Sequence, residues 1–321
     1  MKSSFTSSLK TARFIALDTL ASSNVAAFRE SFFKPQIPIV LPRGQFRNLP
    51  AISRWFAASS SSSPTDIEPS SFRSLNYDYL EQFRDSHVPL ELTTKASNGS
   101  NTQCEESFKR FHAPLSFFLD WTRSVEDSNP KGTSQKTGPA NIPNVRLYLA
   151  QCQLLDLAAP LRDDFPAPPY VTDAGKGDIY DTNVWIGIAP TYTPLHRDPN
   201  PNIFVQLAGA KHIRLLSPNA GLTIYDSVRA RVGKSGGVRS AAFRGEDMMH
   251  GLEKELLDQA IWGKHECEDG DQPVVENASE EAYGYEVLVT AGDGVFIPTG
   301  WWHSIKGVGE GITASVNWWF R

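Results

Sequence analysis

The stretch Thr193-Pro-Leu-His196-Arg-Asp198, followed closely by Phe204-Val-Gln206, carries most of the information about the fold of this chain. In a β-strand successive side chains point to opposite faces, so His196 and Asp198 project from the same face. They can therefore share one ligand. A lone His-x-Asp pair also occurs by chance and can be a structural ion pair. The surrounding sequence has to decide between these readings.

The deciding context lies 107 residues later, in Ala291-Gly-Asp-Gly-Val-Phe-Ile-Pro-Thr-Gly-Trp-Trp-His303. A Gly-Asp-Gly turn leads into a short apolar strand and then into a Pro-bounded loop that ends in His303. Two imidazoles and one carboxylate on neighbouring barrel strands form the facial triad typical of non-haem Fe(II), which leaves positions open for a co-substrate and O₂. A closed zinc site would instead need four protein ligands. The pattern indicates an open iron site formed by His196, Asp198 and His303.

Short β-rich runs fill the chain from residue 144 onward and are separated by Pro, Gly and Asn. The runs are 184–188, 203–207, 211–216, 286–290, 294–297 and 312–319. No parallel-sheet helices alternate with them, which favours an antiparallel barrel or jelly roll. Residues 250–262 place Leu252, Leu256, Leu257 and Ile261 on one helical face, so we expect a helix within an insertion. Upstream, residues 19–33 and 115–125 also show helical spacing.

These patterns divide the chain into three parts. Residues 1–27 form an N-terminal extension without a clear fold, 28–143 a mixed helical and α/β region that packs on the barrel, and 144–321 the barrel, with an insertion at about 219–285. Polar Ser/Gly/Pro-rich stretches at 58–66, 97–103 and 128–139 are typical of surface loops or linkers.

Charge is uneven in and around the insertion. Residues 211–244 carry seven Lys/Arg and one acid, whereas 266–281 carry seven acids and no Lys or Arg. Two solvated surface segments explain this pattern, and a charged substrate-docking surface is the functional alternative.

Composition excludes several classes of protein. The chain has 321 residues, of which 40% are hydrophobic and 21% charged, a globular balance. No apolar run reaches membrane-spanning length, and a net charge of -5 argues against coating nucleic acid by bulk charge. Three distant cysteines without a CxxC pair indicate a reducing, intracellular setting and are too few for a Cys/His zinc module. Residues 1–17 fit a mitochondrial presequence only loosely, and a frayed N-terminus is the favoured interpretation. We therefore expect the nucleus or cytoplasm in preference to the mitochondrion.

From about Phe28 onward the chain resembles the JmjC branch of the 2-oxoglutarate-dependent oxygenases, within the cupin superfamily. The resemblance rests on four stretches: Tyr148-Leu-Ala-Gln-Cys-Gln-Leu-Leu-Asp156, Trp185-Ile-Gly to Asp198, Phe204 to Pro218, and Ile297-Pro to Trp319. Within that branch the chain is most similar to small stand-alone members that hydroxylate protein side chains, especially the arginyl-hydroxylase type once described as a lysine demethylase. The resemblance implies a mainly β fold, a double-stranded β-helix with flanking helices.

The resemblance also assigns roles to individual residues. It implies that the iron ligands are His196, Asp198 and His303, and that Lys211 pairs with the distal carboxylate of 2-oxoglutarate. A dianion entering an apolar barrel needs such a countercharge, because its desolvation is otherwise costly. Without this context Lys211 would be read as an ordinary surface lysine at a strand start. The remaining co-substrate contacts are two hydroxyl donors and an amide donor: Thr193, Tyr148 and Asn202.

Five tryptophans lie in or near the predicted strands: Trp185, Trp301, Trp302, Trp318 and Trp319. Most are expected to pack in the core. The hypothesis for the substrate pocket is that Trp185 and one of the terminal pair, assigned to Trp318, line it, exclude water and stack on a cationic side chain.

The resulting hypothesis is an enzyme, an Fe(II)- and 2-oxoglutarate-dependent dioxygenase that uses O₂ to hydroxylate a protein or peptide side chain, arginyl in the first place. N-methyl-lysine demethylation is the alternative within the class. An inactive cupin-like scaffold and a metal-dependent cupin acting on small molecules are the alternatives outside it. We expect no sequence-specific nucleic-acid binding and no membrane association, and we keep a homodimer as the candidate assembly.

Overall fold

The computed structural model describes the chain from residue 12 to 321, apart from 59–72, 97–104, 129–144, 238–247 and 264–281. Most of the start of the chain with presequence-like composition, most of the predicted Ser-rich loops and the acidic run at 266–281 lie outside the described residues. Within the described part, no helix is long and apolar enough to cross a bilayer.

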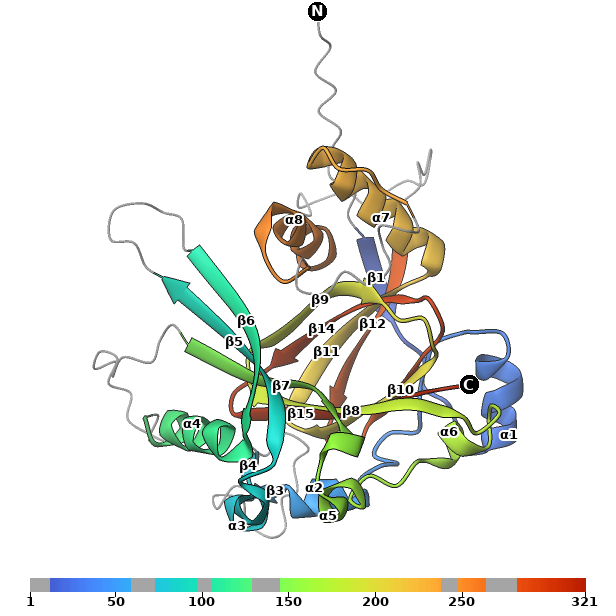
Figure 1. The fold of residues 1–321 in the computed structure, drawn as a ribbon. Coiled ribbons are helices and arrows are strands. Elements are labelled where there is room, and N and C mark those ends of the chain that lie inside the picture. The colour runs from blue at the N-terminus through green and yellow to red at the C-terminus, as the bar shows by residue number, and fades with distance from the viewer. Residues whose placement is uncertain (1–11, 59–72, 97–104, 129–144, 238–247, 264–281) are drawn as a thin grey trace, which may run out of the picture.

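Eight strands form a double-stranded β-helix (Figure 1), which confirms the predicted fold class. The chain alternates between the two sheets except from β11 to β12, which are neighbours in one sheet. One sheet holds, in spatial order, β13 (Gly294–Ile297), β10 (Asn202–Ala208), β15 (Ile312–Phe320) and β8 (Ile179–Ile188). The other holds β12 (Ala282–Thr290), β11 (Ala210–Leu216), β14 (Trp302–Val308) and β9 (Thr191–Arg197).

Further strands extend both sheets. The larger sheet continues beyond β8 through β7 (Val145–Gln153), β5 (His87–Ala96) and β6 (Glu105–Pro114), and at its other edge through β2 (Ile39–Val40). The smaller sheet gains β1 (Ala12–Ala16), which runs parallel to β12. Part of the predicted N-terminal extension is therefore a sheet strand. A separate two-stranded sheet pairs β3 (Phe56–Ala58) with β4 (Arg73–Leu75).

Helices from the N-terminal region and from the segment between β7 and β8 surround the larger sheet (Figure 1). They are α1 (Val25–Phe28), a π-helical turn Arg29–Phe33, α2 (Pro50–Arg54), α3 (Tyr77–Leu80), α4 (Leu115–Ser128), α5 (Ala159–Arg162), α6 (Pro169–Thr172), and 3₁₀ turns at Glu81–Phe83 and Leu154–Asp156. The predicted helix 115–125 is confirmed. The predicted helix 19–33 begins later, because Thr19 bridges Val40 and the Asn24 side chain caps α1.

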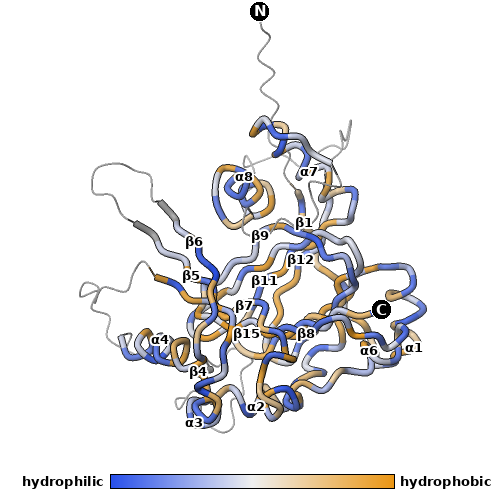
Figure 2. The backbone as a smooth tube through the Cα atoms, in the orientation of Figure 1, coloured by the Kyte–Doolittle hydropathy of each residue, from blue (hydrophilic) through white to orange (hydrophobic). Residues whose placement is uncertain are grey.

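Two helices lie between β11 and β12, α7 (Pro218–Arg231) and α8 (Gly251–Trp262). The predicted helix 250–262 is confirmed with His250 as its N-cap residue. Its buried face holds Leu257 and Ile261, but Leu252, predicted to share that face, is exposed. The sequence patterns did not predict α7. In Figure 2 the tube of α8 alternates between orange and blue, as expected for a helix with one buried face.

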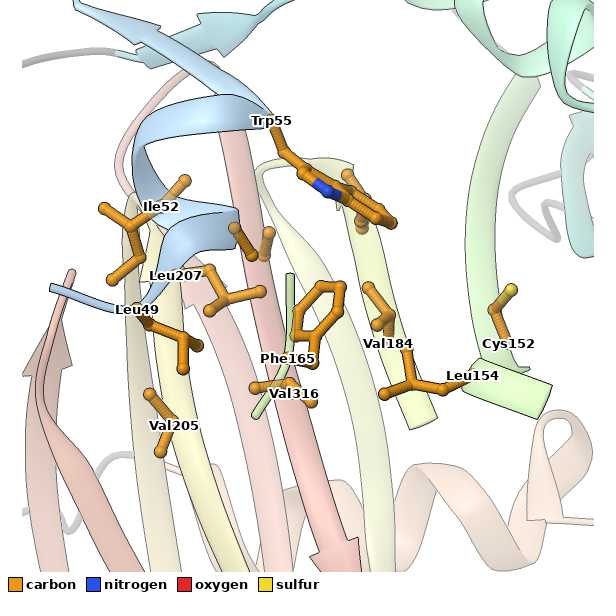
Figure 3. Packing of buried hydrophobic residues seen from close by; sticks show 14 of the residues in the cluster. Leu49, Ile52, Trp55, Cys152, Leu154, Phe165, Val184, Val205, Leu207 and Val316 are labelled. Carbon is orange, nitrogen blue, oxygen red and sulfur yellow. The ribbon is translucent and has the colours of Figure 1, made fainter. Parts of the chain in front are cut away.

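The main core lies between the larger sheet and the N-terminal helices (Figure 3). Strand β10 is buried along its whole length, because the barrel interior covers one face and this core the other. Phe28 packs edge-to-face against Tyr170 and Phe296, with ring centroids 5.1 Å apart in both pairs. The strands that carry the candidate site are therefore backed by a close-packed core, which limits how far they can move.

Candidate functional site

The three predicted metal ligands come together at one end of the barrel. His196 lies near the end of β9, Asp198 just after it, and His303 on β14, where it pairs in register with His196. Their ligand atoms all lie within 4.8 Å of one another. The Asp198 carboxylate is 3.9 Å from His196 Nε2 and 3.6 Å from His303 Nε2. The spacing brings three donors around one point, as a single metal ion requires.

Backbone carbonyls orient both imidazoles. His196 Nδ1 lies 2.8 Å from the Pro194 oxygen, and His303 Nδ1 lies 3.1 Å from the Trp301 oxygen. A carbonyl oxygen only accepts hydrogen bonds, so each Nδ1 carries the proton and each Nε2 lone pair faces Asp198. Burial, together with the nearby His196 ring, lowers the pKa of His303 to about 4. This ring is therefore neutral near pH 7, the form that binds metals.

The position of the Asp198 carboxylate is fixed by Trp319, a residue that the sequence hypothesis did not choose. The indole Nε1 of Trp319 donates to Asp198 Oδ2 at 2.9 Å. Trp319 lines the pocket, whereas Trp318 is only 1% exposed and belongs to the core on the other face of β15. The assignment of Trp318 to the substrate pocket is therefore corrected to Trp319. Strand alternation could have shown this, since Trp319 shares a face with the polar pair Ser315 and Asn317.

Lys211 on β11 lies in the same pocket. Its side chain is almost fully buried, and Nζ donates to Ser315 Oγ at 2.7 Å and to the Tyr148 hydroxyl at 3.4 Å. Among the ion pairs formed by the described residues, none involves Lys211. Burial lowers the pKa of Lys211 to about 7. A buried amine with two hydroxyl partners and no carboxylate is an incomplete site that a bound anion would complete.

Three of the other predicted contacts reach the pocket, and one does not. Tyr148, Thr193 and Trp185 all line it. Burial, followed by the Glu91 charge, raises the pKa of Tyr148, so its hydroxyl stays protonated. Asn202 is fully buried and shares a strand face with Phe204, but it does not line the pocket. Both polar atoms of its amide lack a hydrogen-bond partner within the described part of the chain.

The pocket that connects these groups encloses about 400 Å³ when the open solvent at its mouth is counted. The metal triad and Lys211 both line it, with Phe204 and Ile305 as apolar wall residues. Besides Trp319, five lining residues were not predicted from the sequence: Thr191, Phe204, Ile305, Ser315 and Asn317. An open triad together with a buried, uncompensated amine fits a metal ion and a small dicarboxylate that chelates it, so the residues present suit Fe(II) and 2-oxoglutarate.

Comparison with known proteins places the chain in a family. The model of the cupin-like domain matches residues 25–321, so the chain belongs to the cupin-like domain family. It is 24% identical over 297 residues to lysine-specific demethylase JMJ30 of Arabidopsis thaliana, a match covering 92% of this chain and 53% of that protein. It is 22% identical over 308 residues to lysine-specific demethylase 8 of Xenopus tropicalis, covering 95% and 53%.

A shorter match relates the chain to lysine-specific demethylase 8 of Danio rerio, with 30% identity over 175 residues that cover 54% of this chain and 36% of the relative. The matches include proteins described as JmjC domain-containing, such as protein D of Dictyostelium discoideum. The resemblance to the JmjC branch of the cupin superfamily is thereby confirmed. The chain spans about half the length of the curated relatives that it matches over most of its own length.

Proposed function

We propose that this chain is an Fe(II)- and 2-oxoglutarate-dependent oxygenase that hydroxylates a side chain of a protein substrate, with arginine as the first choice. One observation carries the proposal. A triad of two imidazoles and a carboxylate lines the same pocket as a buried lysine that has no carboxylate partner among the described residues. A closed structural metal site needs no such cation, whereas a chelating keto-diacid does.

The residues of the pocket have separate tasks in this proposal. His196, Asp198 and His303 hold the iron, and Lys211 with Ser315 binds the distal carboxylate of 2-oxoglutarate. When bound, iron and 2-oxoglutarate supply the oxidising chemistry, in which O₂ and 2-oxoglutarate are converted to succinate, CO₂ and one oxygen atom for the substrate.

The chain itself positions and shields the reacting groups. The indole of Trp319 keeps the Asp198 carboxylate in place. The Tyr148 hydroxyl is a donor that stays protonated, because burial raises its pKa. The rings of Trp185 and Phe204 line the pocket and exclude water from it.

The charges that line a groove beside the pocket favour a substrate with a cationic side chain. Its lining includes the acids Glu91, Asp156 and Asp181, and its bases Arg110 and His112 are fewer. Arg110 is already paired with Glu91 at 2.6 Å. Arginine and methyl-lysine are both cations, so the groove attracts either. Resemblance to the arginyl-hydroxylase type favours hydroxylation.

Demethylation is the second candidate, because three of the relatives named above are described as lysine-specific demethylases. The two outcomes differ only in the carbon that is oxidised. Hydroxylation of a side-chain methylene gives a stable alcohol. Hydroxylation of an N-methyl group gives a hemiaminal, which collapses to the free amine and formaldehyde. The same triad serves both.

The test is succinate release by Fe(II)-loaded protein with arginine-containing or methyl-lysine-containing peptides, together with the mass of the peptide product. We expect turnover with an arginine peptide and a product that has gained one oxygen atom. Loss of a CH₂ from a methyl-lysine peptide would establish demethylation instead. Failure to bind either Fe(II) or 2-oxoglutarate would refute the proposal and favour the inactive scaffold.

A further inference from the structure

A second cavity lies against the wall of the metal pocket. Tyr148 and Thr191 line both cavities, so this pair of side chains stands between them. The second cavity is open to solvent and measures about 1500 Å³ when that solvent is counted. Residues of α8 line one side of it and residues of β5, β6 and β7 another; in Figure 1 α8 lies beside the β5–β6 hairpin. We call it the α8 cavity.

Both acids of the α8 cavity already have partners. Asp258 on α8 accepts a hydrogen bond from the Tyr192 hydroxyl and pairs with Lys254 Nζ at 3.3 Å. Glu91 accepts two hydrogen bonds from Arg110 on one oxygen, at 2.8 and 2.6 Å. Each carboxylate is therefore already engaged by a basic side chain, and neither forms an ion pair with Lys306 or Arg146 among the described residues.

Two cations of the same cavity have no such partner within the described residues. Lys306 Nζ lies 4.4 Å from the ring centroid of Trp262 and 5.5 Å from that of Tyr192, and it forms no ion pair there. The Arg146 guanidinium donates to the Pro190 carbonyl oxygen at 3.1 Å and likewise forms no ion pair among these residues. The lining thus holds two cations that form no ion pair within the described part of the chain, although the Asp258 charge acts on one of them, Lys306.

The environment of Lys306 favours an incoming anion. Burial lowers its pKa, and the charges of Arg214 and Lys254 act in the same direction, although Asp258 opposes them. A positive potential in a partly enclosed cavity concentrates anions. Apolar residues also line it, namely Phe108, Leu147, Ile188, Met249 and Val308. A lone inorganic ion would leave this apolar surface uncovered, whereas a peptide can cover it.

We propose that the α8 cavity binds an acidic segment of the polypeptide substrate, whose carboxylates pair with Lys306 and Arg146. This inference rests on the proposed function insofar as the bound polypeptide is the substrate. The cavity shares Glu91 with the acidic groove and two residues with the metal pocket, so the three sites are contiguous. The substrate that fits has acidic residues on the side of the α8 cavity and a cationic residue at the metal pocket.

The test uses the full chain and a fluorescently labelled hexaglutamate peptide as the probe, with hexaglutamine as the uncharged control. Binding is measured by anisotropy in wild type, Lys306→Gln and Arg146→Gln. Lys34→Gln is the matched control, because Lys34 is exposed and, among the residues that the structure describes, pairs with its helical neighbour Glu30 alone. Repeating the titrations in a Lys211→Met background distinguishes binding in the α8 cavity from binding of hexaglutamate at the co-substrate pocket.

We expect hexaglutamate to bind and hexaglutamine to bind more weakly. Each neutralising variant should weaken hexaglutamate binding by roughly five- to tenfold, since each removes one charge-assisted contact. Lys34→Gln should bind as wild type does. Arg146 is exposed, so its variant should fold even if Lys306→Gln does not. Hexaglutamate binding that neither variant weakens, or no binding at all, would overturn the proposal.

Citrate serves as the competing small anion. If citrate binds the cavity more tightly than hexaglutamate does, the site takes a free polycarboxylate and the polypeptide assignment is overturned. Failure of the proposed oxygenase function looks different: hexaglutamate still binds in a manner that depends on Lys306 and Arg146, yet no peptide stimulates succinate release. Conversely, turnover of an arginine peptide without binding of hexaglutamate would overturn the docking site alone.

Discussion

Two lysines on neighbouring strands of one sheet show how the degree of burial changes the role of a lysine side chain. Lys211 on β11 pairs with Gly307, and Lys306 on β14 pairs with His212, so the two lysines are one register position apart. Lys211 lines the metal pocket and Lys306 the α8 cavity. Lys211 is enclosed by hydroxyls, whereas Lys306 lies half-buried against aromatic rings. An anion should therefore matter more to the inner lysine than to the outer one.

The largest expected effect concerns the metal pocket, on the side of Lys211. Asp198→Ala removes one of three ligands, so iron binding should weaken by more than about 100-fold, because even loss of a group that only hydrogen-bonds to a metal ligand costs about 10- to 100-fold. Succinate formation should fall below detection. Asp198 is partly exposed at a strand end, so the metal-free melting temperature should change by only a few degrees. Full turnover in this variant would refute the iron assignment and remove the functional difference between the metal pocket and the α8 cavity.

The two lysines can be compared directly by the same substitution. Lys211→Met should weaken the binding free energy of 2-oxoglutarate by about 2 kcal/mol, because a charge-assisted bond is lost. The dissociation constant should therefore rise roughly 30-fold. Lys306→Met should leave that constant within about twofold of wild type, because Lys306 does not line the metal pocket. Titration of each iron-loaded variant with 2-oxoglutarate measures both values. Equal effects would show that the inner lysine does not hold the co-substrate.

Protonation offers a second comparison of the inner lysine with its Met variant. Burial lowers the pKa of Lys211 to about 7, below the usual 10.5 of the unfolded chain. The unfolded state therefore binds more protons between these values, and the free energy of unfolding rises as pH increases from 7 toward 10. Between pH 7 and 9 the deprotonation of Lys211 should add on the order of 2 kcal/mol to the free energy of unfolding of the co-substrate-free protein.

Denaturant titrations at pH 7 and pH 9 check this expectation. Other groups also titrate in that range, so the quantity to compare is the difference between wild type and Lys211→Met. Wild type should gain stability relative to the variant as pH rises, and saturating 2-oxoglutarate should reduce the gain, because a bound carboxylate favours the charged amine. The same gain in both proteins would mean that Lys211 is not buried in an uncompensated state.

The sequence predicted the metal triad because its signal is local. His196 and Asp198 are two residues apart on one strand face, and His303 follows a recognisable turn and strand. The two predicted sheets of a jelly roll then bring these segments together without any knowledge of packing. The resemblance to JmjC proteins supplied Lys211, Tyr148 and Thr193, which the structure places around the same pocket.

Packing and register decided what the sequence did not predict. Alternation groups Trp319 with Ser315 and Asn317, but which residues that face meets depends on how β15 pairs with β10, where Asn317 lies opposite Phe204 and Ser315 opposite Gln206. The α8 cavity depends on contacts between segments far apart in the chain. Arg146 and Lys306, for example, come from β7 and β14, strands of different sheets, and line the same cavity. No local pattern carries that information.

The smallest effect is expected from the indole that contacts Asp198. Trp319→Phe keeps an aromatic ring but removes the donor at 2.9 Å from the carboxylate, so iron affinity should fall by about tenfold. Trp262→Phe is the matched change on the outer side, since its indole donates to Ser304 Oγ, also at 2.9 Å, away from the metal pocket. Competition with a chelator should therefore detect weaker iron binding in Trp319→Phe and unchanged binding in Trp262→Phe. Unchanged iron affinity in both variants would show that Asp198 holds its position without Trp319, and that the backbone after β9 alone orients this ligand.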